Sequence, residues 1–506
     1  MVLCDAAAPG RTKAPARAPI HRDRVLGAVG STVIAGGGLL AGVTPLGEVA
    51  IDLPLLRDLR ALPTLSVSVL YAGLAMLLLA WWRVGVSVGA DGGPSGRELA
   101  TTAAWWAAPF AVITPIFSGD VHSYLAQGAM TMAGLDAYRD GPSALGGPLT
   151  VNVPEIWQHT PAPYGPVFLQ LAAAVTALTG GGVWAGIIGM RVLALLGVGL
   201  LAWSVPRLAH LCGVRPAAAL WLGVLNPLVL LHLVGDAHNE AVMLGLMCLG
   251  LLLALRRRPV VGIVLITLAA LVKAPAVVAL AFVVPVWARH LAGRYGRLRA
   301  AQRIVLVAAV TSLIVTAATR SGFGWVRALG TPTHAHTWMS ITTDLGWAAG
   351  SLLHRLNGLA IEHTINAFWL AGLALAAGAN LFLWRRVDRI GPVAALGLGL
   401  AVVVLAGPVV HPWYLLWAVV PLAAAARGAG TRRVVAIGSV VLVLLVLPGG
   451  VQPGLPAALG AVLGSSAVLV ASVAARRRSR QRGWARPADE PVPAGGPTEV
   501  HVRPTV

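Results

Sequence analysis

Long apolar runs follow one another along most of the chain, separated by short polar or arginine-rich stretches. Between Val25 and Ala475 the runs are roughly 15 to 22 residues long, about the length of a helix that crosses a lipid bilayer. The pattern predicts an all-α, polytopic transmembrane protein with about 13 to 14 spans. We place spans at 25–45, 63–82, 100–118, 184–204, 217–234, 240–255, 260–272, 275–288, 302–319, 365–384, 391–409, 413–427, 434–449 and 458–475.

Two apolar stretches do not fit a simple span. Residues 164–182 are apolar enough to cross a bilayer, but a span there would move the downstream arginine clusters to the opposite side. We therefore interpret 164–182 as a re-entrant or interfacial segment. Residues 260–288 are too long for one untilted span, and Lys273-Ala274-Pro275 interrupts them. Because proline disfavours helix at the preceding residue, we expect two short helices, of the kind that line a cavity.

Composition and charge add an orientation. Only 11% of the residues are charged, and the mean hydropathy is +0.77, whereas a soluble domain carries about 25% charged residues. Of the 38 lysines and arginines, 30 fall in segments on the side that holds both termini and 7 on the other side. Because basic loops stay in the cytoplasm, this predicts a multi-pass plasma-membrane protein with cytoplasmic termini. The net charge of +19 is then explained by basic cytoplasmic loops at the membrane surface, and no nucleic-acid partner is expected.

The domain organisation follows from this topology. We expect a basic cytoplasmic tail at 1–24, one transmembrane domain at 25–475 and a disordered basic cytoplasmic tail at 476–506. Two long non-cytoplasmic loops, 119–183 and 320–364, interrupt the transmembrane domain. Membrane lipids are partners throughout, and the tail arginines suit anionic headgroups.

Asp120 is the leading catalytic candidate. It directly follows a predicted span, and an acid at that depth is costly unless it is paired or has a function. The other interpretation is a helix N-cap for the segment 121–134. The neighbouring His122 and Tyr124 are candidate sugar-binding residues.

A second polar cluster lies between two predicted spans. Asp236, His238, Asn239 and Glu240 offer more hydrogen-bonding groups than a short turn needs, although a polar turn remains the alternative. These side chains suit sugar hydroxyls, and they are also compatible with a divalent metal. The sequence requires no cofactor, and we assign no metal ligand.

Cations and aromatic residues complete the set of candidates. Lys273 and Arg191 lie in apolar surroundings at the expected outer side, where each could bind a phosphate or extend to the membrane interface. Tyr164, His411, Trp413 and Tyr414 suit a sugar face or an interfacial aromatic belt. The chain has no GxxxxGKS, HExxH or GxSxG motif, so any activated substrate should be borne by the membrane.

These motifs together resemble a known family. The run from Ser118 to Gly128 and the run Ala162–Pro166 are similar to those of actinobacterial α-(1→6)-mannopyranosyltransferases that use polyprenyl-phosphate-mannose. The resemblance covers about residues 100–430. Further motifs follow in the expected order, namely Asn226-Pro227, Asp236–Glu240, Lys273-Ala274-Pro275 and His411–Tyr414.

The resemblance implies a fold and a reaction. It implies a glycosyltransferase C-type fold, with Asp120 as the catalytic acid residue on the first long outer loop. It further implies an inverting mannosyltransferase of the outer face, with a polyprenyl-phosphate-mannose donor and a mannan or lipoglycan acceptor of lipomannan and lipoarabinomannan biosynthesis. A lipid-linked sugar flippase or transporter, or a transferase of another lipid-phosphate sugar, is the alternative. A transporter should show paired charges at mid-membrane and inverted repeats.

Overall fold

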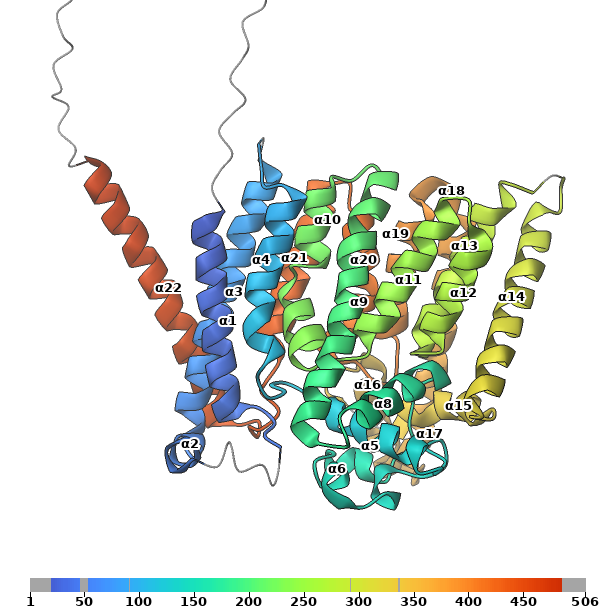
Figure 1. The fold of residues 1–506 in the computed structure, drawn as a ribbon, viewed down its shortest axis with the longest axis horizontal. Coiled ribbons are helices and arrows are strands. Elements are labelled where there is room, and N and C mark those ends of the chain that lie inside the picture. Colours follow the sequence, from blue (N-terminus) through green and yellow to red (C-terminus); the bar gives the residue numbers. More distant parts are fainter. Residues whose placement is uncertain (1–19, 46–52, 91, 292, 335–336, 485–506) are drawn as a thin grey trace, which may run out of the picture.

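The computed structural model describes residues 20–45, 53–90, 92–291, 293–334 and 337–484. Every regular element in these ranges is a helix, which confirms the all-α prediction (Figure 1). Each of the fourteen apolar segments placed from sequence contains helix. The hydropathy pattern therefore located the helical elements correctly.

Fewer helices are long enough to cross a membrane than the sequence analysis expected. By length and composition six described helices qualify, and a seventh span exists if a pair bent by 111° counts as one, against the 13 to 14 expected. The bent pair consists of the π-helix η4 (Val229–Gly235) and α11 (Glu240–Leu255). The six are α1 (His21–Ala41), α3 (Pro63–Gly89), α9 (Val183–Leu211), α14 (Gly296–Thr319), α17 (Ile361–Arg385) and the apolar part of α22 (Leu455–Trp484).

Most of the remaining apolar segments form three helical hairpins. Their arms are short: α12, with 12 residues, is about 18 Å long, whereas the hydrocarbon core is about 30 Å thick. The hairpin turns therefore lie within the body of the protein, above α5 (Asp120–Met132) and α8 (Pro166–Leu178) in Figure 1. The expected break at Lys273 is confirmed. The hairpins are α10 (Pro216–Gly223) and η4 with α11; α12 (Pro259–Ala270) with η5 (Ala274–Val277) and α13 (Val278–Ala288); and α19 (Pro392–Leu405) with η7 (Pro412–Leu415) and α20 (Leu416–Ala425).

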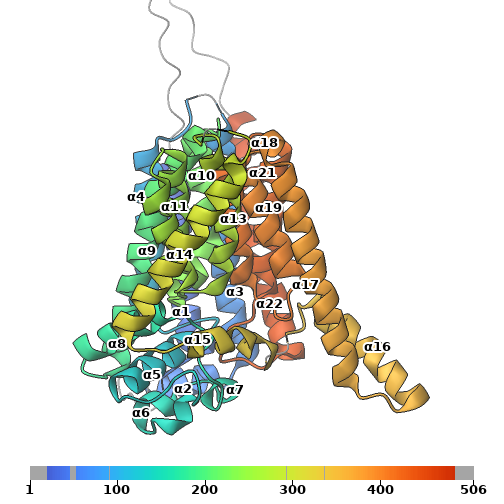
Figure 2. The same cartoon turned by 90° about the vertical axis from the view of Figure 1, so that its right-hand side faces the viewer.

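The two long loops are folded and gather at one end of the bundle (Figures 1 and 2). Residues 164–182 contain only the 13-residue α8 (Pro166–Leu178), which packs against α5 (Asp120–Met132). The rest of the first loop forms η3 (Pro142–Ala144), α6 (Gly147–Val151) and α7 (Glu155–Gln158), and the second forms α15 (Gly324–Arg327), η6 (Ala328–His334) and α16 (Ile341–Asn357). The other elements are α2 (Pro54–Arg60), α4 (Gly96–Ala107), η2 (Ala108–Ala111), α18 (Val387–Ile390) and α21 (Ala429–Leu445).

Helix α22 extends past Ala475, the last residue of the expected transmembrane domain, to Trp484. The arginines in this stretch do not break the helix, because arginine is a good helix former. Residues 1–19 and 485–506, which make up most of the two expected tails, lie outside the described residues.

Candidate functional site

Three hairpin turns meet the start of α5. The turn between η4 and α11 carries Asp236 to Glu240, Lys273 lies between α12 and η5, and His411 directly precedes η7. Residues of η4 contact η7, and residues of α11 contact both η5 and α20. Asp120 is the first residue of α5. Motifs that are far apart in the sequence therefore form one cluster.

His238 lies at the centre of this cluster. Its Nδ1 atom is 3.3 Å from the Tyr124 hydroxyl, 3.6 Å from Asp120 Oδ2 and 4.0 Å from Glu240 Oε2. Its ring stacks on Trp413 with 4.2 Å between the ring centroids. Four residues predicted from sequence thus converge on the imidazole of a fifth.

Asp120 is the accessible member of the central group. The Asp120 side chain is 20% exposed, whereas the His238 and Glu240 side chains are fully buried. Burial raises the pKa of Asp120 to about 6, and the nearby positive charge of Lys273 acts in the opposite direction. A carboxylate with a pKa close to the working pH is suited to accept a proton from a substrate hydroxyl.

Lys273 provides the positive charge of the site. Its ammonium group forms an ion pair with Glu240 and lies 4.4 Å from the ring centroid of Tyr414, with Trp417 and Tyr164 at 5.6 and 5.8 Å. The lysine side chain is 11% exposed. An ammonium group has three N–H donors, so it can serve a carboxylate and an anionic ligand together.

Asp236 and Arg191 make contacts inside the protein. Asp236 Oδ1 accepts hydrogen bonds from the backbone N–H groups of Ile116 and Phe117, and Oδ2 lies 3.1 Å from His232 Nδ1. The Arg191 guanidinium donates two hydrogen bonds to the carbonyl oxygen of Gly235, at 2.7 and 3.2 Å. Both side chains are buried. All of these contacts lie within the protein, and the sugar-binding role of Asp236 and the phosphate-binding role of Arg191 stay predictions.

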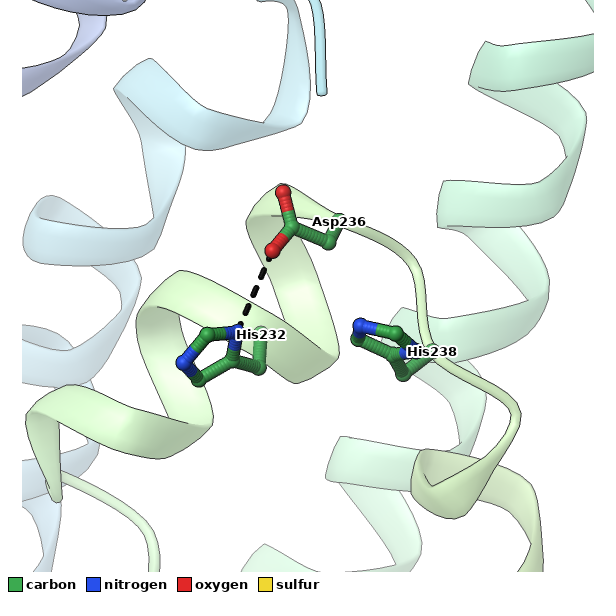
Figure 3. A group of neighbouring side chains, drawn as sticks. All are labelled: His232, Asp236 and His238. Carbon is green, nitrogen blue, oxygen red and sulfur yellow. Dashed lines mark hydrogen bonds and ion pairs between the residues drawn. The ribbon is translucent and has the colours of Figure 1, made fainter. Parts of the chain in front are cut away.

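His232, Asp236 and His238 form a group of metal-binding residue types (Figure 3). One potential ligand atom from each lies within 4.8 Å of the others, and two histidines with an aspartate suit a divalent cation. Asp236 Oδ1 already accepts two backbone N–H groups, and Oδ2 lies within hydrogen-bond distance of His232 Nδ1. We assign these contacts to hydrogen bonding, and the metal compatibility stated from the sequence stays a prediction.

Aromatic rings surround the ionised groups. His411 stacks on Trp413 at 4.4 Å, and Tyr414 stacks on Trp417 at 4.6 Å. Tyr164 meets the Tyr124 ring edge-on at 5.2 Å. The sugar-binding candidates Tyr164, His411, Trp413 and Tyr414 therefore line the same cluster.

Several buried polar atoms of the cluster have no hydrogen-bond partner among the described residues. They include Nε2 of His238, Oε2 of Glu240 and both amide atoms of Asn239. Leaving such a group unsatisfied costs about 1–3 kcal/mol, so these atoms are expected to meet a polar ligand or water. His122 is also buried, but no contact recorded for the described residues joins it to the cluster.

Sequence reasoning missed three contributors. Trp417 faces Lys273, His232 holds Asp236, and the Ser118 hydroxyl accepts the backbone N–H of Asp120 at 3.2 Å. Trp417 and His232 lie in apolar helical runs, where an aromatic residue indicates core packing. Their only signals were spacings of three residues from Tyr414 and four residues to Asp236, which place side chains on one helix face.

The chain matches known proteins along most of its length. The family profile described as alpha-(1->6)-mannopyranosyltransferase, N-terminal domain, matches residues 24–289, and the profile of the MptB C-terminal domain matches residues 342–476. A probable alpha-(1->6)-mannopyranosyltransferase of Mycolicibacterium smegmatis is 36% identical, over 94% of this chain and 92% of its own length.

Two further relatives have similar names. Alpha-(1->6)-mannopyranosyltransferase A of Mycobacterium tuberculosis is 39% identical over 81% of both chains. Alpha-(1->6)-mannopyranosyltransferase B of Corynebacterium glutamicum is 35% identical over 90% of this chain and 82% of its own length. No solved structure matches the chain. The chain therefore belongs to the alpha-(1→6)-mannopyranosyltransferase family, and it is a multi-span membrane glycosyltransferase.

Proposed function

We propose that the protein transfers mannose from polyprenyl-phosphate-mannose to the 6-hydroxyl of an α-(1→6)-mannan, with inversion, on the non-cytoplasmic face. The acceptor would be the growing mannan core of lipomannan and lipoarabinomannan. The observation that carries this proposal is the junction of Asp120, His238, Glu240 and Lys273, which brings a base and a cation into one partly buried cluster. Base and cation are the two groups that an inverting transfer from a lipid phosphate needs.

Asp120 acts as the general base. It takes the proton from the acceptor hydroxyl while that oxygen attacks the anomeric carbon. The bond between this carbon and the β-linked phosphate breaks, which gives an α-linkage. The partial exposure of Asp120 suits contact with a sugar, and a positioned base contributes roughly 10²–10⁴-fold to the rate.

Lys273 holds the leaving phosphate, and its neighbours hold the lipid. A cavity of about 170 Å³ is lined mainly by apolar residues, including Leu280, Trp325 and two residues close to Lys273 in the sequence, Leu271 and Ala274. A cavity of this character suits the first units of an isoprenoid chain. The charge of Lys273 stabilises the departing phosphate strongly here, because little water surrounds it.

The polar atoms without protein partners and the aromatic rings of the cluster bind the sugars. Asn239 and His238 present buried groups without protein partners, which suit sugar hydroxyls. Trp413 and Tyr414 supply apolar faces of the kind that sugar rings pack against. Because these groups are buried, the site favours a ligand whose polar groups form hydrogen bonds with them.

The test uses purified full-length protein, polyprenyl-phosphate-mannose labelled in the sugar, and a short α-(1→6)-mannoside. We expect labelled, elongated mannoside from the wild type, and we expect Asp120→Asn to lower the rate roughly 10²–10⁴-fold because the amide cannot accept the proton. Polyprenyl phosphates carrying glucose or arabinose serve as matched donors. Undiminished transfer by Asp120→Asn contradicts the base assignment, and exclusive use of another sugar contradicts the donor assignment.

A further inference from the structure

Asp236 joins two segments that are 120 residues apart. Its Oδ1 atom accepts the N–H groups of Ile116 and Phe117 at 2.8 and 3.0 Å, and these residues lie just ahead of α5. The same residue lies in the turn that carries His238. One carboxylate therefore connects the chain that leads to Asp120 with the turn that presents His238.

Further hydrogen bonds complete a rigid frame around this carboxylate. His232 Nδ1 lies 3.1 Å from the second oxygen, and Arg191 holds the carbonyl oxygen of the preceding residue, Gly235. At the other end, the Ser118 hydroxyl accepts the N–H of Asp120. Arg191, His232 and Asp236 are all buried, so the frame has little freedom to adjust.

We propose that Asp236 is a positioning residue that fixes the distance between Asp120 and His238. The inference rests on the proposed function, in which Asp120 is the base. Phe117, whose N–H is bonded, lies three positions before Asp120, and Asp236 lies two positions before His238. The 3.6 Å distance between Asp120 Oδ2 and His238 Nδ1 is therefore set across Asp236, with Arg191 supporting the turn.

This role depends on where the oxygens lie and not on the charge of the residue. An asparagine oxygen can accept both backbone N–H groups, and the asparagine NH₂ can donate to an unprotonated His232 Nδ1. A glutamate keeps the charge and the ligand atoms but is one methylene longer, so its oxygens cannot lie where those of Asp236 do. If Asp236 instead bound a metal or needed its charge to bind the sugar, the glutamate variant would keep more activity than the asparagine variant.

The test compares Asp236→Asn with Asp236→Glu in purified full-length protein. For mannosyl transfer we expect the Asn variant to keep a kcat close to wild type, and the Glu variant to lose roughly 10²-fold in kcat with an unchanged donor KM. In the ligand-free protein, amide hydrogen exchange at residues 116–120 should rise in the Glu variant and stay at the wild-type rate in the Asn variant.

The reverse ranking overturns the proposal. An inactive Asn variant together with an active Glu variant means that charge is required, and loss of a bound Mn²⁺ or Zn²⁺ from the Asn variant identifies a cation as the reason. A raised donor KM with preserved kcat in the Asn variant means direct contact with substrate and also overturns it. Absence of mannosyl transfer by the wild type contradicts the proposed function alone, because hydrogen exchange still ranks the two variants.

Discussion

At the scale of single residues, the site combines groups that carry charge with groups that hold them in place. Asp120, Glu240 and Lys273 carry the charges of the central cluster. His238 contacts two of the three charged groups through a single ring nitrogen. Small displacements of this ring would therefore change the surroundings of Asp120, the proposed base.

The raised pKa of Asp120 predicts a specific pH dependence. The base works only when ionised, so the transfer rate should fall as the pH drops through about 6, and it should level off above that value. The measurement is kcat/KM against pH, with tryptophan fluorescence as a control that the protein stays folded. An exposed aspartate is half-protonated at about pH 4. A rate that stays constant down to well below pH 5 and falls only near that value contradicts the assignment.

At the scale of elements, a close contact between α9 and α11 positions the hairpin whose turn carries His238 and Glu240. A methyl group added at Gly197 on α9 would lie 2.4 Å from the carbonyl of Ala241 on α11. Gly245 on α11 also approaches α9 closely, with an added methyl group 2.7 Å from the Gly197 carbonyl oxygen. Small residues at such contacts let helices approach within a membrane. Because Glu240 begins α11, this contact also positions the ion pair with Lys273.

Gly197→Ala and Gly199→Ala form a matched pair on the same helix. An added methyl group at Gly199 meets nothing within 4 Å, so this variant should be as stable as wild type or slightly more stable, since alanine favours helix by about 0.5–1 kcal/mol. Gly197→Ala should lower the melting temperature in detergent and reduce transfer, because α11 must shift. Equal melting temperatures for the two variants would show that the contact is dispensable.

The sequence was informative wherever a polar residue stood out against apolar neighbours. Asp120, Glu240 and Lys273 were identified on that basis, and the structure brings them together. Asp236 and Arg191 were identified in the same way, but most of their partners are backbone groups, of Ile116, Phe117 and Gly235, which carry no side-chain signal. Hydropathy predicted 13 to 14 spans, whereas six or seven described segments are long and apolar enough to cross a membrane, because hydropathy records how apolar a segment is and not how long its helix is.

At the scale of the whole molecule, arginines mark one end of the bundle. The loops where the hairpins open carry Arg215, Arg256, Arg258, Arg289 and Arg427. The folded long loops at the other end contain few basic residues, among them Arg139 and Arg320. This asymmetry supports the proposed orientation, with the arginine-rich end in the cytoplasm.

Cysteine labelling tests this orientation. In a chain whose three native cysteines are replaced, Ala144→Cys places an exposed thiol in the first long loop, and Ala429→Cys places one at the start of α21. A membrane-impermeant maleimide should label the cysteine at 144 in intact cells and the cysteine at 429 only after permeabilisation. The opposite pattern would move the site to the cytoplasmic face.

The three hairpins have a consequence for how the protein can change over time. In each hairpin the first arm begins at the arginine-rich end and the second arm returns to it. A hairpin therefore does not change the side of the membrane on which any later segment lies. A hairpin can be lengthened, shortened or tilted without inverting the rest of the chain. The turns that carry Glu240, Lys273 and His411 are therefore the parts of the bundle where substrate preference can change among homologues while the membrane topology stays the same.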